Sequence, residues 1–126
     1  MKVFRWVFVA VVLLLTACAA ETMEGYVTIG LDEVLQQQDG GAIVVDVREV
    51  EEFAEGHISG AINVPLSELK KGNRADLDKK ETYIIICRSG NRSKEASDIL
   101  SEGGYDVVNV SEGMSSWTGA VRQLFH

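Results

Sequence analysis

Residues 83–93 read Tyr-Ile-Ile-Ile-Cys-Arg-Ser-Gly-Asn-Arg-Ser, and this stretch decides the fold. Its aromatic and β-branched residues predict a buried strand that ends at Cys87. Gly90 permits a turn where a side chain would not fit. Ser93 is predicted to cap a helix that continues to Leu100. The order is therefore strand, short polar loop, helix.

The loop is a suitable place for a reactive thiolate. Backbone N–H groups at a helix N-terminus stabilise negative charge, and two arginines beside the sulfur should lower the cost of losing its proton. We predict Cys87 as the catalytic residue. The predicted anion-binding loop comprises Arg88, Ser89, Gly90, Asn91, Arg92 and Ser93. The alternative is a buried strand-end cysteine followed by an ordinary surface turn, which the flanking arginines disfavour.

Composition limits the class of protein. The chain has 126 residues, of which 46% are hydrophobic and 25% charged, typical of one globular domain with a single core. A formal charge of −7 argues against nonspecific nucleic-acid binding. The chain contains only two histidines and no clustered ligands, so we expect no metal.

The N-terminus has the pattern of a targeting segment. Lys2 and Arg5 precede an apolar run from Trp6 to Leu15, which is too short for a comfortable membrane span. Residues 15–18, Leu-Thr-Ala-Cys, resemble the lipobox of bacterial lipoproteins, in which the cysteine is acylated after cleavage. We therefore expect residues 1–17 to be a signal peptide, Cys18 to carry lipid, residues 18–25 to form a tether and residues 26–126 to fold. A retained anchor helix and a chance cysteine are the alternatives.

This segment implies a location and a redox state. The protein is expected in the bacterial cell envelope, outside the cytoplasm and on the periplasmic face if there are two membranes. Cys18 and Cys87 are the only cysteines. If Cys18 carries lipid, the mature domain has no disulfide, and a lone thiol in an exported protein points to a catalytic or redox role. Fully extended, the tether reaches about 25 Å, so the site would work near a membrane.

Downstream of the tether, short apolar runs alternate with helical patterns, as expected for an α/β fold with parallel strands and covering helices. Strands are predicted at residues 27–29, 42–47, 61–64, 83–87 and 105–110, and residues 105–110 are predicted to be the last strand of the chain. Helices are predicted to start at Leu31 and Leu66 and to include residues 50–55. Residues 70–76 mix charges without an apolar face and are predicted to form a solvated loop.

Three stretches together resemble the rhodanese, or thiosulfate sulfurtransferase, family in its single-domain form. They are residues 46–48 with 55–65, residues 87–93, and residues 113–117 (Gly-Met-Ser-Ser-Trp). The resemblance spans Tyr26 to about Ala120. It implies a rhodanese-like fold with a parallel five-stranded sheet flanked by helices on both faces. The family often has a second glycine where this chain has Glu112, which leaves the local backbone open.

The resemblance also implies a reaction. In that family the cysteine at the position of Cys87 takes sulfane sulfur from thiosulfate or a related donor and passes it to a thiol or cyanide. A thiolate nucleophile and a sulfite leaving group suit this step. Arg88 or Arg92 can donate two parallel hydrogen bonds to sulfonate oxygens. Persulfide formation needs no organic cofactor, so the expected partners are a small anionic donor and a thiol acceptor.

The other matched residues have structural interpretations. Asp46 and Arg48 follow a buried strand and are expected to support the loop, principally as an ion pair that fixes the turn. His57 is expected to make structural hydrogen bonds, because no nucleophile is near it in sequence. Met114 and Trp117 are expected to pack on one helical face.

Two other classes of function stay open. The first is a phosphatase or arsenate reductase, which would use the same cysteine and arginine against a tetrahedral anion. Four residues separate Cys87 from Arg92, and the related phosphatases have a loop one residue longer. The second is a non-enzymatic module that binds a partner or senses oxidants through Cys87. The intact arginines and glycine disfavour it.

Overall fold

The computed structural model describes residues 25–124. The predicted signal peptide, the lipidation of Cys18 and most of the tether lie outside the described residues. The first described residue, Gly25, is tied to the folded domain, because its carbonyl accepts a hydrogen bond of 3.3 Å from the Ser101 hydroxyl.

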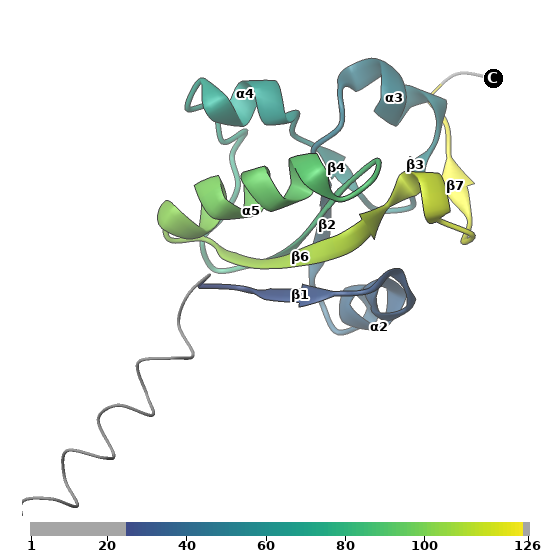
Figure 1. Ribbon diagram of the computed structural model, residues 1–126, viewed down its shortest axis with the longest axis horizontal. Helices are drawn as coiled ribbons and strands as arrows, with labels where there is room; N and C mark the ends of the chain where they lie inside the picture. The colour runs from purple at the N-terminus through teal and green to yellow at the C-terminus, as the bar shows by residue number, and fades with distance from the viewer. Residues whose placement is uncertain (1–24, 125–126) are drawn as a thin grey trace, which may run out of the picture.

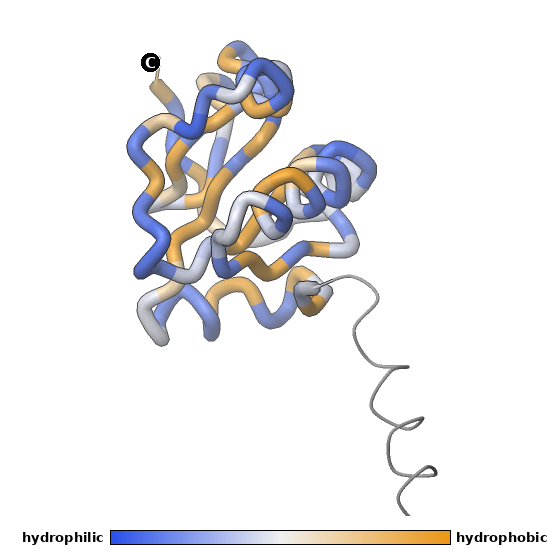
Figure 2. Tube along the Cα trace, turned by 90° about the vertical axis from the view of Figure 1, so that its left-hand side faces the viewer, coloured by the Kyte–Doolittle hydropathy of each residue, from blue (hydrophilic) through white to orange (hydrophobic). Residues whose placement is uncertain are grey.

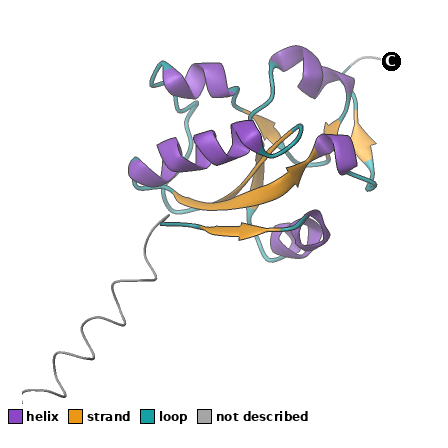
Figure 3. Cartoon of the chain, viewed as in Figure 1, coloured by secondary structure: helices purple, strands orange, loops and turns teal. Residues whose placement is uncertain are grey.

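The described chain is built on a five-stranded parallel sheet in the order β1-β6-β5-β2-β4. Figures 1 and 3 show helices on both sides of this sheet. The predicted α/β fold with five parallel strands is confirmed. Because β5 is the central strand, the loop that follows it lies at the middle of the carboxyl edge, where open α/β sheets bind ligands. The strands are β1 (Val27–Ile29), β2 (Ile43–Asp46), β4 (Ile62–Asn63), β5 (Thr82–Cys87) and β6 (Asp106–Gly113).

Alternate residues of β5 supply the two sides of the core. Tyr83, Ile85 and Cys87 face one cluster, which α4 (Leu66–Lys70) and α5 (Asn91–Glu102) cover. Ile84 and Ile86 face the other, which α2 (Val34–Asp39) and the single turn η3 (Met114–Ser116) cover. Burial on both faces explains the continuous apolar run. Figure 2 shows hydrophobic and hydrophilic residues alternating along the helical turns, as expected for helices with one face on the core.

The prediction that residues 105–110 form the last strand was wrong in two respects. Strand β6 continues to Gly113, three residues beyond the predicted Val110. A further strand, β7 (Val121–Arg122), then pairs antiparallel with β3 (His57–Ile58) in a separate two-stranded sheet. Two-residue strands carry too little periodicity to be read from sequence.

The remaining predicted elements lie within a few residues of the observed ones. The helix predicted from Leu31 starts as the 3-10 turn η2 (Leu31–Glu33) and continues as α2. The amphipathic helix before Gly56 is α3 (Val50–Glu55). Within residues 25–124, no helix has the length and apolar character needed to cross a membrane.

Candidate active site

Cys87 ends β5 and the following loop leads into α5. The helix begins at Asn91, with Gly90 at the N-cap position in a left-handed conformation (φ 102°). Position 90 therefore favours glycine, as the sequence predicted. Ser93 is not the cap: the prediction was wrong because the left-handed Gly90 starts the helix earlier and leaves Ser93 inside its first turn.

Close backbone approaches require glycine at two places around the loop. A Cβ atom on Gly90 would lie 2.3 Å from the carbonyl oxygen of Ser111. A Cβ atom on Gly113 would lie 2.2 Å from the carbonyl group of Arg88. The register between β5 and β6 shifts at this point, and Cys87 pairs with Gly113. The neighbouring Glu112 is not among the described residues with positive φ, so a side chain is accommodated where the family often has glycine.

The segment after β6 also holds the loop. The Arg88 carbonyl accepts hydrogen bonds from the Ser115 backbone N–H at 3.0 Å and from its hydroxyl at 2.8 Å. Met114 and Trp117 pack against the apolar cluster on the α2 side of the sheet, as their spacing predicted. The third matched stretch is therefore a support for the loop.

The Cys87 thiol is buried within the loop and is not in a disulfide; the residue is 1% exposed. Burial opposes ionisation, yet the pKa of Cys87 lies below its ordinary value because the Ser93 hydroxyl and the backbone N–H groups of Ser93, Gly90 and Ser89 stabilise the thiolate. The Gly90 N–H lies 3.0 Å from Sγ. The predicted direction of the pKa shift is thus supported, but its main causes are hydrogen-bond donors, not the two arginines.

Ser93 is fully buried and central to the loop. Its hydroxyl lies 3.1 Å from the Gly90 carbonyl and 3.2 Å from the Val110 carbonyl, and it also acts on the Cys87 sulfur. A hydroxyl has one proton to donate. Ser93 can therefore give its proton to a backbone carbonyl or to the sulfur as the charge on the sulfur changes.

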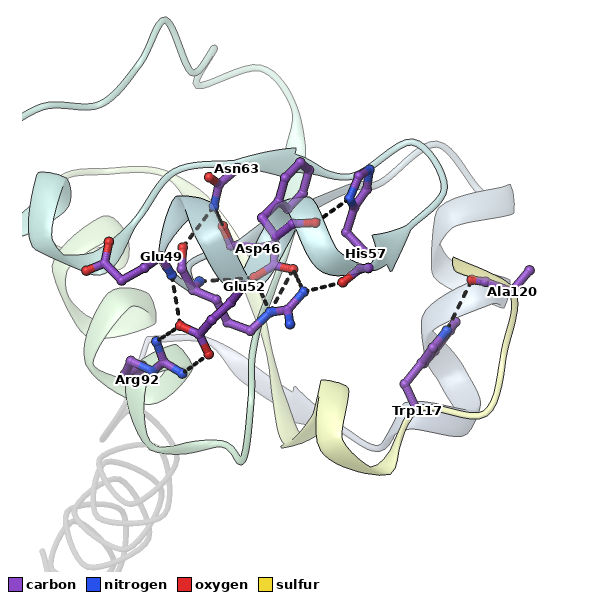
Figure 4. A network of polar contacts seen from close by, with 11 residues as sticks. Asp46, Glu49, Glu52, His57, Asn63, Arg92, Trp117 and Ala120 are labelled. Carbon is purple, nitrogen blue, oxygen red and sulfur yellow. Dashed lines mark hydrogen bonds and ion pairs between the residues drawn. The ribbon is translucent and has the colours of Figure 1, made fainter. Parts of the chain in front are cut away.

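Arg92 makes a two-pronged ion pair with Glu52 of α3 (Figure 4). The distances are 2.7 Å from Nη1 to Oε1 and 3.0 Å from Nη2 to Oε2. The hydrogen bond from Arg92 lowers the pKa of Glu52 to about 2, and the same bond raises the pKa of Arg92. The Arg92 guanidinium, which we expected to bind a sulfonate, is thus hydrogen-bonded to the Glu52 carboxylate.

Asp46 and Arg48 form the predicted ion pair at the end of β2. Figure 4 labels Asp46 beside Asn63 in the same network. Arg48 Nη2 lies 2.8 Å from Asp46 Oδ2 and 2.7 Å from the Gly56 carbonyl oxygen, and both residues are buried. The Asn63 side-chain amide donates to the carbonyls of Asp46 and Arg48, at 2.9 Å each. The pair is part of a satisfied network that fixes the turn leading to α3.

His57 has a structural role, as expected. Its ring stacks on Phe53 with centroids 3.7 Å apart, and its Nδ1 lies 2.7 Å from the Phe53 carbonyl oxygen. The residue is buried and belongs to β3.

Sequence reasoning missed three residues of this site: Glu52, Asn63 and Ser115. Glu52 belongs to an acidic run that resembles a solvated helix face, although the spacing of Glu49 and Glu52 is that of a capping box, which the structure contains. The other predicted loop residues, Arg88, Ser89 and Asn91, are exposed around the thiol. Across the described part of the chain, no group of three or more His, Cys, Asp or Glu residues could hold a metal ion.

Comparison with known proteins identifies the family. The family model of the rhodanese-like domain matches residues 30–120. The chain is 38% identical over 86 residues to the putative sulfurtransferase YtwF of Bacillus subtilis, covering 68% of this chain and 82% of YtwF. It is 39% identical over 71 residues to the thiosulfate sulfurtransferase PspE of Escherichia coli, covering 56% and 68% respectively.

Other relatives are longer, and the match covers only 41% of the putative sulfur carrier protein YrkF of Bacillus subtilis. Among solved structures, a rhodanese-related protein from Thermoplasma volcanium superposes with a TM-score of 0.70 at 35% identity. That match covers 79% of this chain and all of the other.

Proposed function

Because this chain belongs to the rhodanese-like domain family, we propose that it transfers sulfane sulfur through a persulfide on Cys87. The observation that carries the proposal is the buried thiol with its lowered pKa, held 3.0 Å from the Gly90 N–H in a loop of convergent donors. Such a thiolate is a nucleophile for sulfur and needs no metal or organic cofactor.

The donor step balances with thiosulfate. The Cys87 thiolate attacks the outer sulfur, a new S–S bond forms, the S–S bond of thiosulfate breaks, and sulfite leaves with the electron pair of that bond. The negative charge that was on Cys87 Sγ then resides on the outer sulfur of the persulfide. The loop N–H groups of Ser89, Gly90 and Ser93, which lower the pKa of the thiol, lie around this developing charge.

The acceptor step returns the enzyme to its starting state. An acceptor thiolate attacks the outer persulfide sulfur, the S–S bond to Cys87 breaks, and Cys87 leaves as a thiolate. A low thiol pKa favours this step too, because it makes Cys87 a better leaving group. The same donors therefore serve both halves of the transfer.

Membrane tethering is the second part of the proposal. Gly25 precedes β1 at the amino edge of the parallel sheet, whereas Cys87 ends β5 at the carboxyl edge. A lipid on Cys18 would thus join the chain at the opposite edge of the sheet from the loop, which leaves the loop open to a thiol acceptor in the aqueous part of the envelope. Changing Cys18 to Ala in the full chain should release or misprocess the protein. If that variant stays in the membrane fraction at mature size, the lipid anchor is wrong.

One experiment tests the chemistry. After incubation with thiosulfate, mass spectrometry of the intact protein should show one added sulfur, removable by cyanide or a thiol and absent from Cys87→Ala. A parallel incubation with a phosphate ester tests the phosphatase alternative. The proposal fails if the wild-type protein gains no sulfur from any sulfane donor, and Cys87-dependent ester hydrolysis would replace it with phosphoryl chemistry.

A further inference from the structure

One of the two arginines in the Cys87 loop is neutralised by a carboxylate. Arg92 is paired with Glu52. Arg88, by contrast, makes no ion pair with any residue between 25 and 124, and it is exposed. The loop therefore presents one unpaired cation to a donor, where its sequence alone suggests two.

Glu52 is held in place for this contact. Its Oε1 atom also accepts a hydrogen bond of 3.1 Å from the Glu49 backbone N–H, in the capping box at the start of α3. The Glu52 side chain is 26% exposed and the Arg92 side chain 33%, so the pair is partly shielded from water. Both terminal nitrogens of Arg92, Nη1 and Nη2, point at the Glu52 carboxylate (Figure 4).

The pair lies close to the sulfur, because Arg92 belongs to the first turn of α5 and follows by two residues the N-cap Gly90, whose N–H lies 3.0 Å from Cys87 Sγ. In keeping with this placement, the Cys87 thiolate contributes to the raised pKa of Arg92. A donor sulfonate seated over Cys87 and drawn to Arg92 would meet the Glu52 carboxylate at the same guanidinium. Like charges at close range disfavour binding, and the effect is larger where water is partly excluded. Binding of thiosulfate, a dianion, is disfavoured most strongly.

We propose that Glu52 sets the donor selectivity of the loop: by occupying Arg92 it disfavours dianionic donors such as thiosulfate relative to organic persulfides with little net charge. This inference rests on the proposed sulfur transfer and names its preferred donor class. In the persulfide reaction the Cys87 thiolate attacks the outer sulfur of R–S–SH, the S–S bond breaks, and R–S⁻ leaves. No sulfonate has to be held.

The test measures how one substitution, Glu52→Gln, changes the rate of sulfur loading of Cys87 from two donors, thiosulfate and an organic persulfide. Glu52→Gln keeps the shape of the side chain and removes its charge, which frees the Arg92 guanidinium for an anion. Sulfur loading of Cys87 from thiosulfate should become about tenfold faster in kcat/KM, the effect of one charge-assisted hydrogen bond. Loading from the persulfide of 2-aminoethanethiol, whose ammonium group offsets its charge, should change by less than about twofold by the same reasoning.

Glu51→Gln is the matched control, because Glu51 is an exposed glutamate on the same helix and, among residues 25–124, makes no ion pair with the loop. It should leave both rates unchanged. Glu52→Ala provides a second variant that also frees Arg92. If Glu52→Gln and Glu52→Ala slow loading from thiosulfate or change both donors equally, Glu52 positions Arg92 productively or has no selective role, and the inference is wrong.

A binding measurement separates this inference from the sulfur-transfer proposal. In protein carrying Cys87→Ser, which cannot turn over, titration calorimetry with thiosulfate should show about tenfold tighter binding when Glu52→Gln is added. Absence of sulfur transfer from every donor would overturn the proposed function, and tighter binding would still support the role of Glu52 toward anions. Unchanged or weaker binding overturns that role even if sulfur transfer is confirmed.

Discussion

The Gly90 Cα atom faces the Ser111 carbonyl oxygen so closely that a Cβ atom at Gly90 would lie 2.3 Å from it. This approach joins the thiol loop to β6, two residues before the strand ends at Gly113. The loop geometry therefore depends on two constraints at one residue, a left-handed backbone (φ 102°) and a missing side chain. The same glycine supplies the N–H that contacts the Cys87 sulfur.

Gly90→Ala should destabilise the protein by more than backbone strain alone. Gly41 is the matched control, because it has a similar φ of 108° and a Cβ atom added there would have no neighbour within 4 Å. Gly41→Ala should cost about 1–2 kcal/mol for the left-handed backbone, and Gly90→Ala about 1–3 kcal/mol more for the clash. Urea denaturation measures both. Equal losses for the two variants would show that Ser111 moves aside freely.

The sequence predicted what is local and periodic. The buried strand before Cys87, the turn at Gly90 and the helix after it follow from neighbouring residues, and all three are present. The Glu52–Arg92 pair joins residues 40 apart, and nothing in an acidic helix distinguishes Glu52 from its neighbours before the chain is folded. The role of Ser115 likewise depends on how β6 passes the loop. Tertiary contacts therefore account for what sequence patterns missed.

Ser93→Ala should raise the pKa of Cys87. Burial favours the neutral thiol, and the Ser93 hydroxyl counteracts burial by stabilising the thiolate. Without that hydroxyl, the effect of burial on the pKa of Cys87 is larger. The midpoint of the alkylation rate against pH should move upward, and alkylation near neutral pH should slow. Ser97→Ala serves as control, because Ser97 is buried in the same helix and its hydroxyl donates to Asn109 Oδ1 at 3.4 Å. A midpoint that moves equally in both variants would assign the shift to general loosening of α5.

Arg48→Ala should be strongly destabilising. It leaves the Asp46 carboxylate, which is 0% exposed, without its partner, and breaking a buried pair in this way costs about 3–5 kcal/mol. The exposed ion pair between Lys70 Nζ and Glu95 Oε1, 3.2 Å apart, is the control for the cost of breaking a pair at the surface. Lys70→Ala should cost about 0–1 kcal/mol. Similar small losses of unfolding free energy in both variants would mean that the Asp46 network does not depend on Arg48.

The Glu52–Arg92 pair should make stability depend on pH in a defined window. The pKa of Glu52 falls from an ordinary 4.5 to about 2 on folding. A carboxyl whose pKa is lowered by folding contributes stability that is fully present above pH 4.5 and is lost as the pH falls toward about 2, because the unfolded chain binds the proton first.

Glu52→Gln removes this group, so the unfolding free energy of the variant should fall less steeply between these two pH values than that of the wild-type protein. Glu51→Gln should keep the wild-type slope. Denaturation series at several pH values from about 5 down to about 2.5 measure the difference, and parallel curves for wild type and Glu52→Gln would show that the ion pair does not persist in solution.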